Sequence, residues 1–397
     1  NIKNLTQLNP ELYAASLDDI ENFSQRLENK KSVENLNSKK LEQVKKKEKN
    51  VPVEVESDVI AFGDNVIKEA ISLEASDIHI EPFKNTCQVR FRIDGVLKTM
   101  DKFTKFLTQN YNAVVTRIKI ISKLDIAERR VPQDGGSTFS FDKKEVDLRI
   151  SILPTKNNER IVMRILNKEA GAQSLDELGF QADDLNNLNE AINSPQGMIL
   201  VTGPTGSGKT TTLYTILQTI NKPSMNILTA EDPVEYELEA IGQVQVREDI
   251  GYTFETALRS FLRQDPEVIL VGEIRDKETV DIALKAALTG HLVFSTIHTN
   301  DAPSTITRLQ NMGTPDYLIS AACTLILAQR LARKTCPDCR VPDEKINPKV
   351  LSSIGFTPEQ ASRIKPVIGK GCENCASGGS DIGSGYKGRM GIYEILK

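Results

Sequence analysis

Residues 198–220 place the strongest constraint on how this chain can fold. An apolar run, 198–202, leads into a glycine-rich loop, and a helical stretch follows from Thr211 to Ile220. The loop matches the P-loop pattern at every fixed position and consists of Gly203, Pro204, Thr205, Gly206, Ser207, Gly208, Lys209 and Thr210. Such a loop needs a strand before it and a helix after it, because the loop amides and the helix N-terminus together bind phosphate. The sequence therefore predicts a phosphate-binding loop in an α/β domain.

The polar side chains of this loop indicate which ligand it binds. Lys209 can reach the β- and γ-phosphates of a nucleotide, and the hydroxyl of Thr210 can ligate Mg²⁺. Thr211 opens the following helix, beside the phosphates. These residues predict binding of ATP together with Mg²⁺. A chance glycine-rich turn is the alternative, and the matching strand and helix on either side disfavour it.

Further short apolar runs predict strands that are buried on both faces of a parallel sheet, at 227–229, 268–271 and 292–294. Glu231 follows the first run, Glu273 the second and His298 the third. The carboxyl ends of parallel strands meet at the ligand-binding edge of such a sheet. Either glutamate can therefore act as the base that activates water, and His298 can contact the γ-phosphate. Capping of a turn or an ordinary ion pair is the alternative for each glutamate, and a structural role is the alternative for the histidine.

The chain of 397 residues is too long for one ordinary hydrophobic core. Residues 1–56 are polar and lysine-rich, which predicts a flexible charged linker. We expect a small α+β domain over 57–167, with helices near 58–74 and 103–124 and a hairpin signal at Asp94-Gly95. An ATPase domain over 168–335 and a C-terminal subdomain over 336–397 complete the predicted organisation.

Four of the six cysteines form two CxxC pairs, Cys336 with Cys339 and Cys372 with Cys375. Each CxxC turn can present two thiolates to one ion, so the pairs predict a structural Zn²⁺ in a tetrahedral Cys₄ site. Disulfides or four unligated thiols are the alternatives, and a reducing compartment disfavours the first of them.

Charge and hydropathy exclude some partners. The formal net charge is −4 and the sequence pI is about 5.7, so the chain lacks the basic excess typical of proteins that bind a phosphate backbone. Nucleic acid is therefore not an expected partner. No apolar run approaches the roughly 20 residues that a membrane-spanning helix needs, which favours a cytoplasmic protein. The lysine-rich stretch 39–49 is a solvated spacer or, alternatively, a contact for anionic lipid.

Taken in order, these motifs resemble those of the secretion ATPase superfamily, and specifically the motor ATPases of type II secretion and type IV pilus assembly. The resemblance covers about residues 57–397. Besides the P-loop, the matching segments are an acidic box at 229–235, an atypical Walker B motif at 271–276, a histidine box at 290–300, and the upstream segments 76–82, 90–95 and 129–135.

The resemblance implies a fold class, a machine and a set of roles. It implies a PAS-like N-terminal domain joined to a RecA-like ATPase domain, in a homo-hexamer at the cytoplasmic face of the inner membrane. The family hydrolyses ATP to move pilin or pseudopilin subunits, together with an inner-membrane platform protein and a membrane-anchored docking protein. Glu273 then takes the catalytic carboxylate role, assisted by Glu231, and His298 lies near the γ-phosphate. Arg149 and Arg164 match arginines that reach the phosphates.

The resemblance also bears on three further arginines and on the subgroup of ATPase, and it leaves alternative functions open. Arg259, Arg263 and Arg275 match positions at the active site or an interface. Retraction ATPases generally lack the tetracysteine segment, so the cysteine pairs favour an assembly or secretion ATPase. The sequence does not decide between pilus assembly, type II secretion and competence. A nucleic-acid translocase of RecA-like fold and a nucleotide-switched scaffold with little turnover are the alternative functions.

Overall fold

The computed structural model describes residues 53–141, 144–166, 174–375 and 384–397. The chain forms two compact units, 1–62 and 63–397. The described part of the first unit is the beginning of helix α3 (Val53–Ser72). The predicted linker, including its lysine-rich stretch, lies largely outside the described residues.

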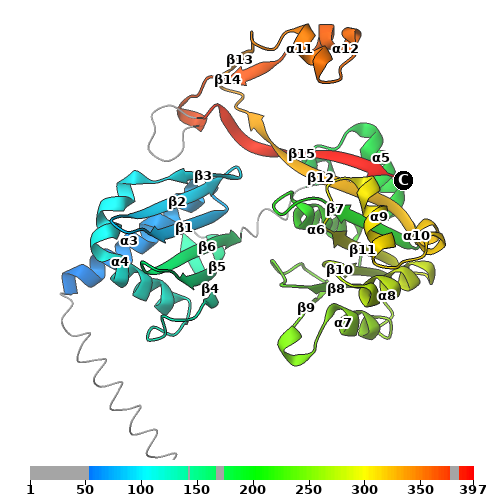
Figure 1. Cartoon of the computed structure of the whole chain (residues 1–397). Coiled ribbons are helices and arrows are strands. Elements are labelled where there is room, and N and C mark those ends of the chain that lie inside the picture. Colours follow the sequence, from blue (N-terminus) through cyan, green and yellow to red (C-terminus); the bar gives the residue numbers. More distant parts are fainter. Residues whose placement is uncertain (1–52, 142–143, 167–173, 376–383) are drawn as a thin grey trace, which may run out of the picture. The chain divides into compact units, whose positions relative to one another are not determined.

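The first part of the second unit is an antiparallel sheet in the order β3-β2-β1-β6-β5-β4. Burial alternates along β2, where Val89 and Phe91 are buried and the arginines between them are half-exposed. Helix α4 (Asp101–Ile121) packs against β2 through an apolar face that includes Phe103 and Leu107 (Figure 1). The strands are β1 (Asp77–Pro82), β2 (Cys87–Ile93), β3 (Val96–Thr99), β4 (Gln133–Phe141), β5 (Lys144–Pro154) and β6 (Glu159–Leu166).

The second sheet is mixed, in the order β15-β12-β7-β11-β10-β8-β9. Its strands run parallel from β12 to β9, whereas β15 pairs antiparallel with β12 at one edge. The parallel part of this sheet was predicted, and its antiparallel edge strand was not. The fold is an α/β fold in which this second sheet is mixed. The strands are β7 (Gly197–Thr202), β8 (Ile227–Glu231), β9 (Gly242–Gln245), β10 (Val268–Val271), β11 (Leu292–Ile297), β12 (Cys323–Thr335) and β15 (Tyr386–Leu396).

Helices cover both faces of this mixed sheet, as its continuous apolar strands require. Along β7, Ile199 and Val201 enter a core shared with α5 and α6, whereas Met198 and Leu200 enter a core shared with α7, α8, α9 and α10. The helices are α5 (Ala182–Ile192), α6 (Lys209–Ile220), α7 (Phe254–Phe261), α8 (Lys277–Leu288), α9 (Ala302–Asn311) and α10 (Asp316–Ala322). Short 3-10 helices lie at Leu175–Leu178 and Glu248–Ile250.

The chain between β12 and β15 forms a small module around the cysteine pairs. It contains β13 (Arg340–Pro342), α11 (Pro348–Ser353), α12 (Pro358–Arg363), β14 (Val367–Gly369) and a 3-10 turn at Glu373–Cys375. Strands β13 and β14 pair antiparallel. Across the described ranges, no helix is both long and apolar enough to cross a membrane.

Candidate functional site

The glycine-rich loop lies between β7, which ends at Thr202, and α6, which begins at Lys209. The predicted strand and helix are therefore both present. Pro204, Thr205 and Gly206 at the crest of the loop are exposed, whereas Ser207 is buried. Gly203, Gly206 and Gly208 have φ values of 143°, 78° and 89°, a region that L side chains rarely adopt. The Thr202 hydroxyl donates to the Ile297 carbonyl at 2.8 Å and thereby joins the ends of β7 and β11.

The Lys209 ammonium lies folded over the loop. It donates to the Gly203 carbonyl at 2.9 Å and to the Pro204 carbonyl at 3.3 Å. Burial lowers the pKa of Lys209, and the negative charge of Glu273 acts in the opposite direction. Thr210 is exposed and Thr211 is half-buried at the start of α6. The lysine therefore sits where a phosphate at the helix N-terminus would meet it.

Glu273 lies two residues after the end of β10. Its side chain is 18% exposed. One carboxylate oxygen accepts from Arg275, and the other lies 3.5 Å from Nε2 of His298, just after β11. Arg275 also lies 3.7 Å from the Asp232 carboxylate. The structure thus brings Arg275 and His298 into contact with the two oxygens of Glu273.

Glu231, the last residue of β8, has a different environment. It is 5% exposed, and protein donors hold its carboxylate. The Thr229 hydroxyl donates to it at 2.5 Å, the Gln243 amide donates at 3.2 Å, and the Tyr214 hydroxyl of α6 also donates to it. Burial, reinforced by the Glu231 charge, raises the pKa of Tyr214, so this phenol remains a donor. Glu231 therefore ties α6 to β8, and Tyr214 and Gln243 are partners that sequence reasoning missed.

The other arginines of the matching segments, and the second histidine of the histidine box, are paired in other ways. Arg149 donates to the Glu235 carboxylate at 3.0 Å and to the Val234 carbonyl at 2.7 Å, at the end of the acidic box. Arg164, its neighbour across β5 and β6, pairs with Asp77 at 3.1 Å. His291 makes a 3.0 Å contact with the Ala286 carbonyl at the end of α8, which is a structural role. On α7, Arg259 pairs with Glu255, and Arg263 donates to the Arg259 carbonyl.

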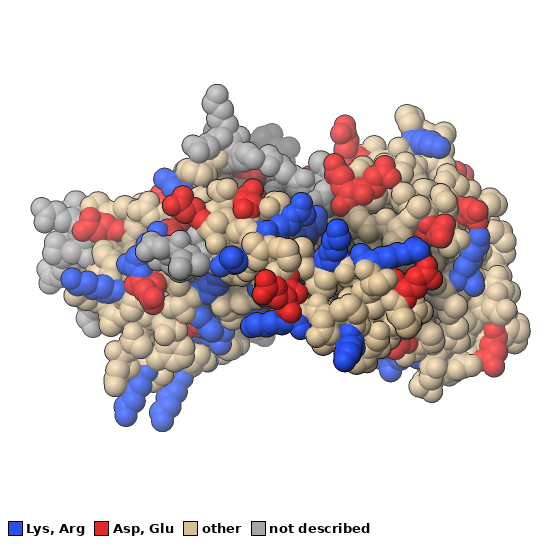
Figure 2. All heavy atoms as spheres, turned by 90° about the horizontal axis from the view of Figure 1, so that it is seen from above, with Lys and Arg blue, Asp and Glu red and all other residues tan. Residues whose placement is uncertain are grey.

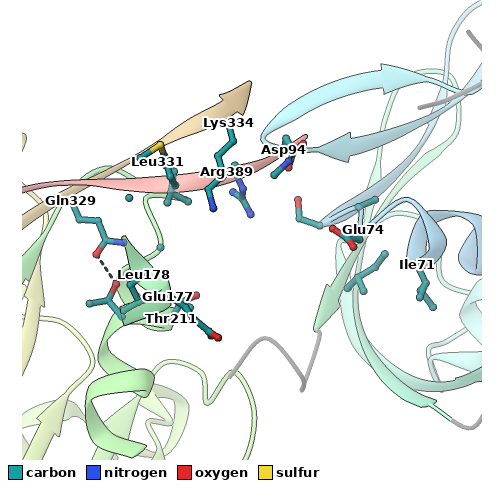
Figure 3. A pocket seen from close by; sticks show the side chains of 18 of the residues that line it. Ile71, Glu74, Asp94, Glu177, Leu178, Thr211, Gln329, Leu331, Lys334 and Arg389 are labelled. Atoms are coloured by element: carbon teal, nitrogen blue, oxygen red, sulfur yellow. Dashed lines mark hydrogen bonds between the residues drawn. The ribbon is translucent and has the colours of Figure 1, made fainter. Parts of the chain in front are cut away.

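A pocket of about 1100 Å³ opens beside the P-loop (Figure 3). Gly208 and Thr211 line it at the start of α6, and Leu331 and Tyr393 line it from β12 and β15. Its wall carries charges of both signs: Lys334 and Arg389 are basic, and Glu74, Asp94, Glu145 and Glu177 are acidic. The sequence did not single out any of the residues from β12 and β15, because these strands carry no recognised motif.

The four paired cysteines converge in the C-terminal module. Their Sγ atoms all lie within 4.8 Å of one another. The separations are 3.9 Å for Cys336 and Cys372, 3.8 Å for Cys339 and Cys375, and 3.7 Å for Cys372 and Cys375. Sulfurs bound tetrahedrally to one zinc at about 2.3 Å would be about 3.8 Å apart. The cluster therefore has the dimensions of a metal site, and the remaining cysteines, Cys87 and Cys323, are free thiols elsewhere.

Comparisons with known proteins place these features in a family. The family model described as "Type II/IV secretion system protein" matches residues 53–397. The chain is 48% identical over 339 residues to the type IV pilus assembly ATPase PilB of Myxococcus xanthus, which covers 85% of this chain and 58% of that protein. It is 45% identical over 355 residues to the type II secretion system protein E of Pseudomonas aeruginosa, which covers 89% of this chain and 68% of that protein.

Solved structures agree with the sequence relatives. The pilus retraction motor PilT with bound ADP is 33% identical, with a TM-score of 0.53 over 69% of this chain and 79% of that one. The DotB ATPase of Yersinia pseudotuberculosis is 26% identical, with a TM-score of 0.56 over 68% of this chain and 75% of that one. The predicted resemblance is thus confirmed over both sheets and the cysteine module, and the chain belongs to the type II/IV secretion system protein family.

Proposed function

We propose that this chain is the motor segment of an ATPase that drives pilin or pseudopilin assembly in a type IV pilus or a type II secretion system. The observation that carries the proposal is the contact of Glu273 with His298 at the strand ends, together with the Lys209 ammonium that lies over the P-loop. Relatives named as the pilus assembly ATPase PilB and the secretion protein E support the cargo.

In the proposed reaction, Glu273 accepts a proton from the water that attacks the γ-phosphorus. The new bond forms between water oxygen and phosphorus while the bond to the β-phosphate oxygen breaks, which releases ADP and phosphate. Lys209 and the loop amides stabilise the phosphate charge. His298 lies close enough to Glu273 to contact the same phosphate. Bound Mg²⁺ would neutralise phosphate charge, and Thr210 is the residue whose hydroxyl would bind the ion.

The two glutamates therefore have different proposed roles. Glu231 is held by three protein donors and is buried, so water reaches its carboxylate less readily than that of Glu273. Glu273 is partly exposed and is held through one oxygen by Arg275. We assign the base role to Glu273 and a positioning role to Glu231. The pocket beside Gly208 and Thr211 accommodates the remainder of the nucleotide.

Family membership also supports a wider assembly. We propose a homo-hexamer at the cytoplasmic face of the inner membrane, with a PAS-like domain over 57–167, a RecA-like ATPase domain over 168–335 and a C-terminal subdomain over 336–397. An inner-membrane platform protein and a membrane-anchored docking protein are the proposed partners. The cysteine cluster favours assembly or secretion over retraction.

The purified chain should hydrolyse ATP with Mg²⁺ and without nucleic acid. On the face drawn in Figure 2, basic and acidic side chains are interspersed, so that face carries no uniform basic surface for a phosphate backbone. The steady-state rate of phosphate release should stay within about twofold of the rate without DNA when single- or double-stranded DNA is added. Low salt is used because contacts to a phosphate backbone are strongest there. Stimulation of tenfold or more would instead support the nucleic-acid translocase.

We propose further that Arg149 and Arg164 approach the γ-phosphate during the cycle. Both guanidinium groups are at present held by carboxylates, Arg149 by Glu235 and Arg164 by Asp77. Replacing either arginine with Ala should lower kcat by at least tenfold and change nucleotide affinity by less than about threefold, because charge stabilisation matters most in the transition state. Arg363→Ala on α12 is the matched control, because it removes an arginine whose ion pair with Glu359 is exposed and lies far from the P-loop in sequence. If Arg149→Ala and Arg164→Ala both kept the parent kcat, neither arginine would act on the γ-phosphate.

The cysteine cluster should bind one structural Zn²⁺. Its sulfur separations match a tetrahedral site, and the Cys372 amide N–H lies 3.3 Å from the Cys375 sulfur, an arrangement that stabilises a thiolate. Protein purified without added zinc should contain close to one zinc per chain by metal analysis. Cys336→Ser with Cys339→Ser should remove the zinc and lower the melting temperature, because metal binding contributes to folding.

Cys323→Ala is the control for this zinc prediction, since it removes a thiol that lies outside the cluster. It should retain the full zinc content. A parent protein that contains no zinc, with an unchanged melting temperature in chelator, would show that the module folds without a metal.

A further inference from the structure

Gln329 is a buried polar residue that no recognised motif contains. It lies on β12, which runs parallel to β7, and its neighbour Ala328 pairs with Thr202 at the entrance of the P-loop. Its exposed fraction is 3%. A buried amide requires partners for both its donor and its acceptor, so its contacts reveal what the side chain holds.

Both ends of the Gln329 amide bind the P-loop region. Nε2 donates to the Ser207 carbonyl at 2.8 Å, and Oε1 accepts from the Thr212 hydroxyl at 2.8 Å. Thr212 lies in the first turn of α6 and is fully buried. The bond between Gln329 and Thr212 is the dashed line in Figure 3. One side chain therefore ties both the loop and the beginning of the helix to β12.

The glycines of the loop are fitted to this same residue. A Cβ at Gly203 would lie 2.3 Å from the Gln329 carbonyl oxygen, and a Cβ at Gly208 would lie 2.9 Å from its Nε2 atom. The first distance is a clash with backbone, which cannot move away as a side chain can. The close approach of Gln329 thus accounts for two of the glycines in the motif.

The bond to Ser207 also fixes the direction of the next amide. The peptide between Ser207 and Gly208 is trans, because the cis bond recorded in the described chain is Asp232-Pro233. In a planar trans peptide the carbonyl and the N–H point in opposite directions. Since Gln329 holds the Ser207 carbonyl toward β12, the Gly208 N–H points away from β12, and phosphate-binding loops use such amides as donors.

We propose that Gln329 is a positioning residue that holds the P-loop in its phosphate-binding conformation, through the Ser207 carbonyl and the Thr212 hydroxyl. The inference rests on the proposed nucleotide binding at this loop. Gln329 does not touch the reacting atoms; it acts through the direction of the Gly208 amide and the placement of the α6 N-terminus. Loss of its amide should therefore weaken binding of ADP as well as ATP.

The test is equilibrium titration of the full chain with a fluorescent ADP analogue and Mg²⁺. Gln329→Met keeps a similar length but removes both bonds, and should raise the Kd about tenfold. Thr212→Val removes only the hydroxyl donor and should raise the Kd by a smaller factor, about two- to threefold. Thr324→Val is the matched control, because Thr324 lies at the other end of β12 and donates to the Met198 carbonyl of β7 at 3.1 Å. It should leave the Kd unchanged.

Hydrogen exchange on the same proteins without nucleotide separates positioning from general destabilisation. In Gln329→Met, exchange should accelerate in peptides that cover 203–212 and remain at the parent rate in peptides that cover β10. Parent affinity in Gln329→Met, or equal weakening in Thr324→Val with faster exchange throughout the sheet, would overturn the inference while leaving the proposed function intact. A parent chain that does not bind the ADP analogue would overturn the proposed function itself.

Discussion

Lys209→Ala should reduce ATP hydrolysis to background, a loss of at least a hundred- to a thousandfold. The Lys209 ammonium already lies over the loop, bonded to the Gly203 and Pro204 carbonyls, and needs only to exchange these acceptors for phosphate oxygens. No methyl group can replace that charge in the transition state. Steady-state phosphate release with Mg²⁺ and saturating ATP provides the measurement.

Lys222→Ala is the matched control for the lysine prediction. Lys222 is exposed just beyond the end of α6, so its removal takes one positive charge from the same part of the chain without touching the loop. It should retain the parent rate. Hydrolysis at the parent rate in purified Lys209→Ala would assign the activity to a contaminant or to another site.

Glu273→Gln should lower kcat by about 10²–10⁴-fold and leave nucleotide affinity within about threefold of the parent, the magnitude expected when a general base is lost. The amide keeps the size of the carboxylate but cannot accept a proton from water. The melting temperature should change little, because the Glu273 side chain is partly exposed. Turnover, nucleotide titration and thermal melting of one preparation test all three statements.

Glu231→Gln should give the opposite combination, a lower melting temperature with a smaller loss of turnover. Its carboxylate accepts from Tyr214, Thr229 and Gln243, so an amide in its place would direct an N–H at one of these donors. A buried donor left without an acceptor costs about 1–3 kcal/mol of stability. We expect a clear fall in melting temperature. An unchanged melting temperature with complete loss of turnover, alongside an active Glu273→Gln, would move the base to Glu231.

The parallel strands and the P-loop could be predicted from sequence because their signals are local. The run 268–271 corresponds to β10 with the same bounds, and β8 and β11 extend two and three residues beyond the runs predicted for them. Runs of three or four mostly apolar residues, too short for a helix, indicate strands that are buried on both faces. The direction of its carboxyl end then follows from the parallel topology.

Other parts of the fold depend on contacts between distant residues. β1 was not predicted as a strand, although Asp77, His79 and Glu81 alternate with its isoleucines. The sequence does not show that these polar residues are buried, because their partners are arginines of neighbouring strands. The antiparallel pair of β12 and β15 joins segments separated by the whole cysteine module. Neither segment alone specifies its partner.

The same limit applies to the site. The sequence placed Glu231 and Glu273 at strand ends but could not distinguish them, because their difference lies in the partners Tyr214 and Gln243 for one and Arg275 for the other. Gln329 was invisible for the same reason, since it meets Ser207 and Thr212 from a strand more than 100 residues away in sequence. Motifs indicate the chemistry of a site, and only the fold shows which neighbours restrain each group.

The most direct test of the central claim is a single-turnover experiment with radiolabelled ATP, Mg²⁺ and excess protein, in which the bound nucleotide is identified after quenching. The parent should convert the bound ATP to ADP, whereas Glu273→Gln should retain it as ATP over the same interval, because binding through the P-loop remains intact and only proton transfer is lost. Conversion of bound ATP by Glu273→Gln at the parent rate would contradict the assignment of this carboxylate as the base of a P-loop ATPase.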